Sequence, residues 1–237
     1  MKEILLMIIH GLNKTTLLDF PGHLAATVFF GGCNFRCPFC HNASLVLNPK
    51  AQPIIPEEEF FSFLSKRKNI LEGVCITGGE PTLMPDLEDF IRKIKDYGLL
   101  VKLDTNGYKP EVLKDLVNKG IIDYVAMDIK SSPDNYNEAC GAVVDINRIK
   151  ESVEFLKSGA VPYEFRTTIV KELHDKETIL NIGQWLSGCE NYFLQCYKDS
   201  GDIILEGLSA HDSGTLKEYR DILKTTIKNV EIRGLDV

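Results

Sequence analysis

Short β-rich runs alternate with amphipathic helical runs along most of this chain. Strands are expected over residues 26–30, 73–77, 99–104, 124–129, 163–170 and 192–196, with a further short strand over 230–233. Helices are expected over 56–71, 86–97, 110–119, 145–158, 176–186 and 214–225. Strands that alternate with helices of this length are joined by right-handed crossovers and lie parallel. We therefore predict an α/β fold, a partial (open) parallel βα barrel of about six βα units, short of the eight that close a barrel.

A length of 237 residues fits one large domain or two small ones. Within the chain there is no linker, low-complexity segment or charge block that marks a second domain. We therefore predict a single domain over 1–237, with a core at about 24–200, an N-terminal extension over 1–23 and a weakly recognisable C-terminal part over 201–237. Segments 1–24 and 48–56 are interpreted as additions around the barrel.

The charge and hydropathy of the chain disfavour several classes of partner and several locations. The formal net charge of -7 disfavours nucleic acid and anionic membrane surfaces as partners. No stretch approaches the roughly 20 apolar residues that a membrane span needs. The apolar run over 4–9 is short and is followed by His10 rather than by a small-residue cleavage site, so no secretory signal is expected. Unpaired thiols favour a reducing compartment, and we predict a cytoplasmic protein.

Three closely spaced cysteines carry the strongest chemical signal. Cys33, Cys37 and Cys40 form a C-x3-C-x2-C run. Three thiolates can bind a four-iron cluster, which normally takes four protein ligands, so one iron is left open. An open coordination position is what separates a reactive metal site from a structural one. These residues are therefore candidate metal ligands.

Other interpretations of the seven cysteines are less favoured. A zinc site that adds His41 to the three thiolates is chemically possible, but adjacent residues converge poorly on one ion and structural zinc sites use separated ligand pairs. A disulfide framework is disfavoured by the odd number of cysteines in a chain this large. Cysteines with a purely structural role would not need to be clustered as these three are. We interpret the other four cysteines as mostly buried small hydrophobic residues. They are Cys75, Cys140, Cys189 and Cys196.

The unusual motifs all follow predicted strands, which is where active sites of βα barrels lie. They are the cysteine run, Thr77-Gly78-Gly79-Glu80-Pro81, Asp104-Thr105-Asn106-Gly107, Met127-Asp128-Ile129-Lys130, Arg166, and Gln195 with Tyr197. Gly78 and Gly79 lack side chains, so main-chain carbonyls can approach a ligand closely, and an ammonium group is bound by such acceptors and a carboxylate such as Glu80. The alternative is a plain turn between strand and helix.

Charged residues at the expected strand ends are further candidates. Lys130 and Arg166 could bind a carboxylate or a ribose, or could form ordinary ion pairs with Asp128 or Glu164. Asp104, with Asp128 on the next strand, could hold a ribose. Three lone histidines are interpreted as surface or capping residues rather than ligands. These are His10, His23 and His174.

The cysteine spacing resembles the signature of the radical S-adenosylmethionine (SAM) enzymes. Over roughly residues 8–200 the chain is similar to glycyl-radical-enzyme activating proteins, and most to the activating protein of anaerobic ribonucleoside-triphosphate reductase. The resemblance rests on the run 11–22 (Gly-Leu-Asn-Lys-Thr-Thr-Leu-Leu-Asp-Phe-Pro-Gly), on Cys40-His41-Asn42 and on the strand-end motifs. Pyruvate formate-lyase activators usually have Asp-Gly-Pro-Gly where this chain has Asp-Phe-Pro-Gly at 19–22.

The resemblance implies a site and a set of ligands. A [4Fe-4S] cluster would bind Cys33, Cys37 and Cys40, and its open iron would be chelated by the amino and carboxylate groups of SAM. The Gly-Gly-Glu-Pro run would contact the SAM amino group, and Phe39 would lie where the adenine binds. Asp104, Lys130 and Arg166 would be further cofactor contacts, and Asp104 could share a monovalent cation with Asp128, Thr105 and the Met127 carbonyl.

The resemblance also implies a reaction without a separate catalytic side chain. A reductant such as flavodoxin or ferredoxin would deliver one electron, SAM would be cleaved to methionine and a 5′-deoxyadenosyl radical, and that radical would take a hydrogen atom from a glycine Cα of a partner enzyme. Asp19 corresponds to an acid that contacts the partner's glycine loop. The expected partner is anaerobic ribonucleoside-triphosphate reductase. The alternatives are another glycyl-radical enzyme such as pyruvate formate-lyase, or a radical reaction on a small molecule or RNA.

Overall fold

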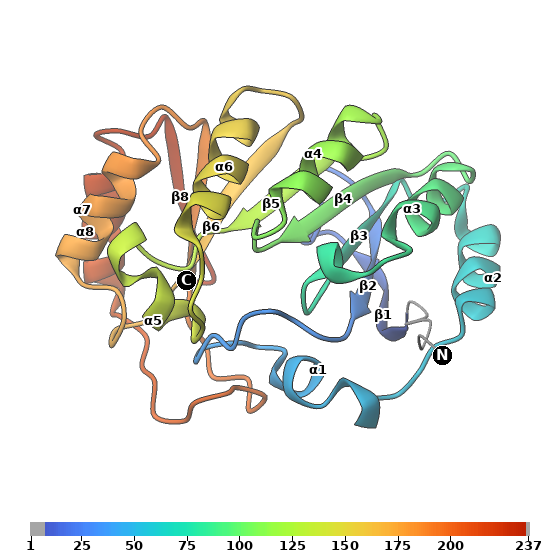
Figure 1. Ribbon diagram of the computed structural model, residues 1–237, viewed down its shortest axis with the longest axis horizontal. Coiled ribbons are helices and arrows are strands. Elements are labelled where there is room, and N and C mark those ends of the chain that lie inside the picture. The colour runs from blue at the N-terminus through green and yellow to red at the C-terminus, as the bar shows by residue number, and fades with distance from the viewer. Residues whose placement is uncertain (1–7, 236–237) are drawn as a thin grey trace.

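The computed structural model describes residues 8–235, and all structural statements below concern these residues. Most of the apolar run over 4–9, for which no secretory signal is expected, lies outside them. One sheet runs through the chain in the order β1 to β8 (Figure 1). Its strands are β1 (Ile9–Thr16), β2 (Ala25–Phe30), β3 (Gly73–Gly78), β4 (Leu100–Thr105), β5 (Tyr124–Asp128), β6 (Tyr163–Ile169), β7 (Asn191–Cys196) and β8 (Asn229–Arg233).

The sheet is a partial barrel. Strands β2 to β8 are parallel, and β1 is antiparallel to β2. No pairing joins β8 back to β1 within residues 8–235, so the barrel is open. Six βα units lead from β2 to β8, which confirms the predicted α/β architecture.

One helix on the outer face follows each of the strands β2 to β7. These helices are α2 (Glu57–Arg67), α3 (Leu87–Lys95), α4 (Pro110–Asn118), α6 (Ile146–Lys157), α7 (Lys176–Trp185) and α8 (Ser213–Leu223). Shorter helices are α1 (Ala43–Leu47) and α5 (Tyr136–Cys140), with 3-10 turns η1 (Pro49–Ala51), η2 (Pro81–Leu83) and η3 (Pro133–Asn135). In α3 the apolar residues recur at helical spacing, and all of them are buried against the sheet. They are Leu87, Phe90, Ile91 and Ile94.

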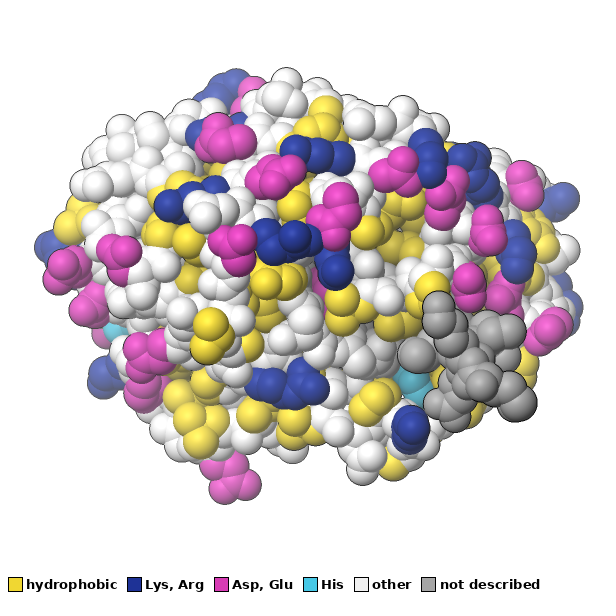
Figure 2. All heavy atoms as spheres, in the orientation of Figure 1, with side chains coloured by type: hydrophobic (Ala, Val, Ile, Leu, Met, Phe, Trp, Pro, Cys, Tyr) yellow, Lys and Arg dark blue, Asp and Glu magenta, His cyan; other side chains and the backbone are white. Residues whose placement is uncertain are grey.

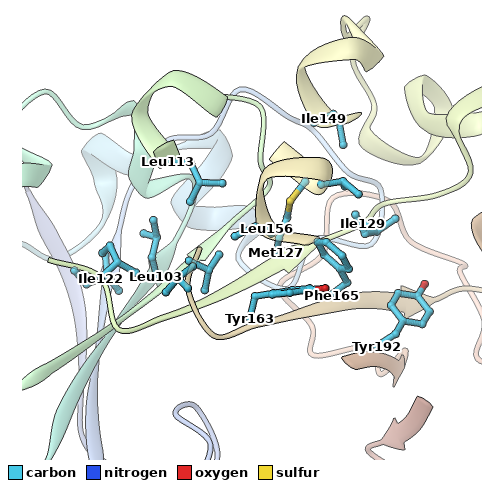
Figure 3. Packing of buried hydrophobic residues seen from close by; sticks show 14 of the residues in the cluster. Leu103, Leu113, Ile122, Met127, Ile129, Ile149, Leu156, Tyr163, Phe165 and Tyr192 are labelled. Atoms are coloured by element: carbon cyan, nitrogen blue, oxygen red, sulfur yellow. The ribbon is translucent and has the colours of Figure 1, made fainter. Parts of the chain in front are cut away.

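The two faces of the sheet have opposite chemistry because side chains alternate along a strand. On the outer face Leu103, Met127 and Phe165 pack with the helices in a continuous apolar core (Figure 3). On the inner face of β4, Lys102 and Asp104 point into the barrel instead. The interior of this barrel is therefore polar and charged, unlike the apolar interior of a closed βα barrel.

The N-terminal segment differs from expectation, because residues 9–16 form a strand of the sheet rather than an addition around it. Strand β1 pairs with β2 from Ile9↔Phe30 to Thr16↔Ala25. Its sequence lacks a strong strand pattern because β1 is an edge strand whose middle is half-buried to exposed. Segment 48–56 lies beside it, where the N–H of Ile55 donates to the carbonyl of Ile9.

The C-terminal part completes the sheet and also reaches the cysteine loop. Helix α8 and strand β8 add the last βα unit. Between β7 and α8, Asp202 accepts hydrogen bonds from the backbone N–H and the hydroxyl of Ser44 at 2.9 and 2.8 Å. Leu205 donates its N–H to the carbonyl of Pro38 inside the cysteine run. None of the helices between residues 8 and 235 is long and apolar enough to cross a membrane.

Candidate active site

A cavity of about 370 Å³ opens at the carboxyl ends of the parallel strands. Its volume lies in the range of small-molecule sites, roughly 300–1,000 Å³. Every residue predicted as a cluster ligand, cofactor contact or partner contact lines it. These residues are Asp19, Cys33, Cys37, Phe39, Cys40, Gly78, Gly79, Glu80, Asp104, Lys130 and Arg166. The parallel strands β2 to β6 thus bring together residues from five segments of the chain, and Asp19 reaches the same cavity from the turn between β1 and β2.

The cysteine loop follows β2 and is fixed by backbone contacts to distant segments. The N–H of Gly32 donates to the carbonyl of Leu45, and the N–H of Arg36 donates to the carbonyl of Cys140. Cys37 is buried, whereas Cys33 and Cys40 are half-buried. Across residues 8–235 no three His, Cys, Asp or Glu side chains converge on the position of a single metal ion. A multi-iron cluster does not require such convergence, because each of its thiolates binds a different iron.

Burial keeps the three thiols protonated in the free protein. It raises the pKa of Cys33 to about 11 and that of Cys37 to about 12. It also raises the pKa of Cys40. Lys130 acts in the opposite direction on all three groups. Lys130 is therefore the protein cation that favours the thiolate forms.

The loop after β3 packs directly on the cysteine loop through its glycines. A Cβ atom on Gly78 would lie 2.3 Å from the carbonyl oxygen of Phe30, and one on Gly79 would lie 1.9 Å from that of Gly32. The side-chain amide of Asn42 donates to the carbonyl of Gly78 at 3.0 Å. Glycine is thus required at both positions because the two loops touch here, whether or not a ligand also approaches the backbone.

Glu80 is an internal anchor in this structure. Its side chain is almost wholly buried and accepts hydrogen bonds from the Thr105 hydroxyl at 2.7 Å and from the backbone N–H of Asn106 at 2.7 Å. The N–H and hydroxyl of Thr82 donate to it as well. Four protein donors therefore engage this carboxylate, and its contact with a ligand amine stays a prediction.

Five charged side chains form one network inside the barrel. Arg166 donates to Asp128 at 2.9 Å and to Asp104 at 3.2 Å. Lys130 pairs with Asp128 at 3.2 Å, and Lys102 pairs with Asp104. Burial alone would raise the pKa of Asp128, but Arg166 and Lys130 outweigh it and hold the pKa at about 2. Three cations therefore face two carboxylates, which leaves an excess of one positive charge.

The ion-pair interpretation of Lys130 and Arg166 is confirmed, whereas their binding of a carboxylate or ribose stays a prediction. Both form the predicted ion pairs with Asp128, and both also line the cavity. Glu164, the other expected partner, instead forms a two-fold ion pair with Arg233 from β8. Sequence reasoning missed Lys102, although its position two residues before Asp104 on the same strand places both side chains on the inner face.

The interpretation of His174 as a surface residue is wrong, whereas the alternative of a capping residue fits its contacts with backbone groups. Its ring is fully buried, accepts the N–H of Val170 at Nδ1 (3.0 Å) and lies 2.9 Å from the Lys130 carbonyl at Nε2. Phe39 meets this ring edge to face with a centroid distance of 6.1 Å. Desolvation lowers the pKa of His174. A lone loop histidine carries no sequence signal for this role, because all of its polar partners are backbone groups.

The comparisons with known proteins agree with this geometry. Residues 27–181 match the family model of the radical SAM superfamily. A Methanocaldococcus jannaschii protein named "putative glycyl-radical enzyme activating enzyme" is 34% identical over 236 residues, which cover 97% of each chain. The pyruvate formate-lyase-activating enzyme of Clostridium pasteurianum is 33% identical over 136 residues, about half of each chain.

A solved structure shares the fold. Streptococcus suis SuiB bound to S-adenosylmethionine superposes on 86% of this chain and 48% of its own, with a TM-score of 0.66 and 16% identity. At that identity the likeness concerns the fold alone. The family model and the full-length relative together assign the activity, which implies a [4Fe-4S] cluster and SAM as cofactors. The chain belongs to the radical SAM superfamily and, within it, to the glycyl-radical enzyme activating enzymes.

Proposed function

We propose that this chain generates the glycyl radical of anaerobic ribonucleoside-triphosphate reductase. The observation that carries the proposal is that one cavity contains both the three cysteines and Asp19, the residue expected to contact the partner's loop. The similarity over residues 11–22 supports this partner. Phe20, which stands where pyruvate formate-lyase activators usually have glycine, is a buried core residue that packs against Gly73.

The donors present at the site fit an iron–sulfur cluster. Three thiols line one cavity beside Lys130, and the side-chain nitrogen of Asn34 is buried without a hydrogen-bond partner among residues 8–235. A free donor beside thiolate ligands suits a group rich in sulfide acceptors. Cys33, Cys37 and Cys40 would hold the cluster. When bound, this cofactor supplies the electron for SAM cleavage, which leads to removal of a hydrogen atom from the partner's glycine.

The protein's own groups would orient SAM. Backbone carbonyls of the run 78–80 are suited to its amino group, and Phe39 offers an aromatic face beside His174 for the adenine. Lys130 and Arg166 are the cations that line the cavity and are the expected partners of the SAM carboxylate. Protein cations already engage the Asp104 and Asp128 carboxylates, so we propose no monovalent cation at these residues.

The glycine loop of the partner would enter the open barrel toward Asp19. This residue lies on the turn between β1 and β2, whereas Cys33 follows the other end of β2. Thr27 on β2 donates its hydroxyl to the Asp19 carboxylate, which turns that group toward the cavity. An extended loop could then pass between the two ends of the barrel.

The remaining partners are proposed from charge and redox chemistry. The reductant would be a one-electron donor such as flavodoxin or ferredoxin, and the compartment would be the reducing cytoplasm. Basic and acidic side chains are interspersed over the face in Figure 2 without a large basic area. Together with the net charge of -7, this disfavours RNA as a substrate.

A panel of partners tests the proposal. The reconstituted protein, SAM and a reductant would be mixed anaerobically with the ribonucleotide reductase from the same organism, and in parallel with pyruvate formate-lyase. Formation of a glycyl radical on the reductase alone supports the proposal. Radical formation only on the lyase would transfer the assignment to the alternative partner, which the C. pasteurianum relative favours.

A further inference from the structure

A pair of side-chain amides lies against the sulfur of Cys33. Nδ2 of Asn106 is 2.9 Å from Oδ1 of Asn34 and 3.8 Å from Sγ of Cys33. The backbone N–H of Phe35 also donates to this sulfur, at 3.3 Å. The sulfur of Cys40 accepts the backbone N–H of Asn42, so the feature that sets Cys33 apart among the described residues is the side-chain amide at its sulfur.

The orientation of the Asn106 amide is fixed from both ends. Its Oδ1 accepts the backbone N–H of Tyr108 at 3.0 Å, so its NH₂ group has to face Asn34 and Cys33. Its own backbone N–H donates to the buried Glu80 carboxylate at 2.7 Å. Asn106 is 5% exposed, so water does not compete for these contacts. The two hydrogens of this NH₂ group match two acceptors, one oxygen and one sulfur.

Metal binding would change the hydrogen-bonding role of the Cys33 sulfur. In the free thiol the S–H group can donate to Oδ1 of Asn34, which lies 3.9 Å away. A metal-bound thiolate has no hydrogen and is only an acceptor, so the N–H groups of Phe35 and Asn106 become its partners. Hydrogen bonds to cluster sulfurs stabilise the more negatively charged reduced state and raise the reduction potential.

We infer that Asn106 is a positioning residue that raises the reduction potential of the cluster by donating a hydrogen bond to Cys33. The inference rests on the proposed cluster site. Asn34 supports the arrangement by accepting the other hydrogen of the Asn106 amide, and Glu80 supports it by holding the Asn106 backbone. This gives the Asp-Thr-Asn-Gly run a function beyond the ribose or cation contacts expected of Asp104.

The test measures the midpoint potential of the reconstituted cluster, which needs neither SAM nor a partner enzyme. We expect Asn106→Ala to lower the ratio of reduced to oxidised cluster at fixed ambient potential by up to about tenfold, a shift of about 59 mV for one electron. Asn34→Ala should give a smaller shift in the same direction. The matched control is Asn118→Ala, which removes an exposed amide at the end of α4 and should leave the potential unchanged.

Each outcome has a distinct meaning. An iron-replete Asn106→Ala protein with the wild-type potential would overturn the inference. If that variant fails to fold or to bind iron, Asn34→Ala decides, and an unshifted potential in it would overturn the inference equally. Failure of the wild-type protein to bind any cluster would overturn the proposed function itself, which distinguishes the two claims.

Discussion

The carbonyl oxygen of Gly32 lies 1.9 Å from the point that a Cβ atom on Gly79 would occupy. The same oxygen accepts the N–H of Glu80 at 2.8 Å. The cysteine loop and the Gly-Gly-Glu-Pro loop therefore meet backbone to backbone. This contact sets where the cluster ligands lie relative to the carbonyls proposed to bind SAM.

Substitution of Gly79 should separate these two loops. We expect Gly79→Ala to lower stability by about 1–3 kcal/mol, the usual cost of overpacking, and to reduce 5′-deoxyadenosine formation at least tenfold. Urea denaturation and a product assay would measure the two effects. Gly98→Ala is the control, because Gly98 has a φ of 75° but open space around its Cβ position. It should cost about 1 kcal/mol of backbone strain and leave activity unchanged. Equal activity losses in both variants would contradict the loop-contact explanation.

The cysteine assignment predicts a sharp division among the thiols. Alanine at Cys33, Cys37 or Cys40 should abolish cluster-dependent SAM cleavage, because each thiolate holds one iron. Alanine at Cys75 or Cys189, both buried in the core, should leave iron content and cleavage intact after correction for folded protein. Iron analysis and 5′-deoxyadenosine measurement would check both groups. Loss of the cluster in the Cys189 variant would refute the ligand assignment.

Removal of Arg166 should destabilise the barrel interior. Its side chain is 13% exposed and bridges Asp104 and Asp128, so Arg166→Met removes the link between these two half-buried carboxylates and leaves each with one lysine partner. Loss of the charge-assisted hydrogen bonds that Arg166 donates should cost about 1.5–3 kcal/mol. Lys176→Met, which removes an exposed pair with Glu218, should cost less than about 1 kcal/mol. Similar free energies of unfolding for both variants would argue against the network.

The buried His174 should make the free energy of unfolding depend on pH. Burial lowers its pKa in the folded protein below the unfolded value of about 6.5. The unfolded state therefore binds more protons once the pH falls below about 6.5, and the free energy of unfolding decreases as the pH falls from there toward the lower folded pKa. In the His174→Gln variant the free energy of unfolding should decrease less over this pH range. Equal slopes for wild type and variant between pH 7 and pH 5 would show that the buried ring is not responsible.

The fold was predictable from the sequence because parallel strands and their helices carry strong patterns. Strand β1 was not, because Gly11, Asn13 and Lys14 at a half-exposed edge give no apolar alternation. The site was predictable as a set of strand ends, since a βα barrel brings those ends together whatever the details of packing. The contacts between side chains within the site were not predictable, because they depend on the curvature of the sheet and on loop geometry. Examples are the pair of Lys102 with Asp104 and the contact of Asn106 with Cys33.

Electron paramagnetic resonance on one anaerobic mixture tests the central claim most directly. The mixture contains iron-replete protein, SAM, a reductant and the anaerobic ribonucleotide reductase from the same organism, and 5′-deoxyadenosine is measured in the same tube. The account predicts a glycyl-radical doublet on the reductase together with 5′-deoxyadenosine. The absence of both, from protein that demonstrably holds a reduced four-iron cluster, would contradict the account.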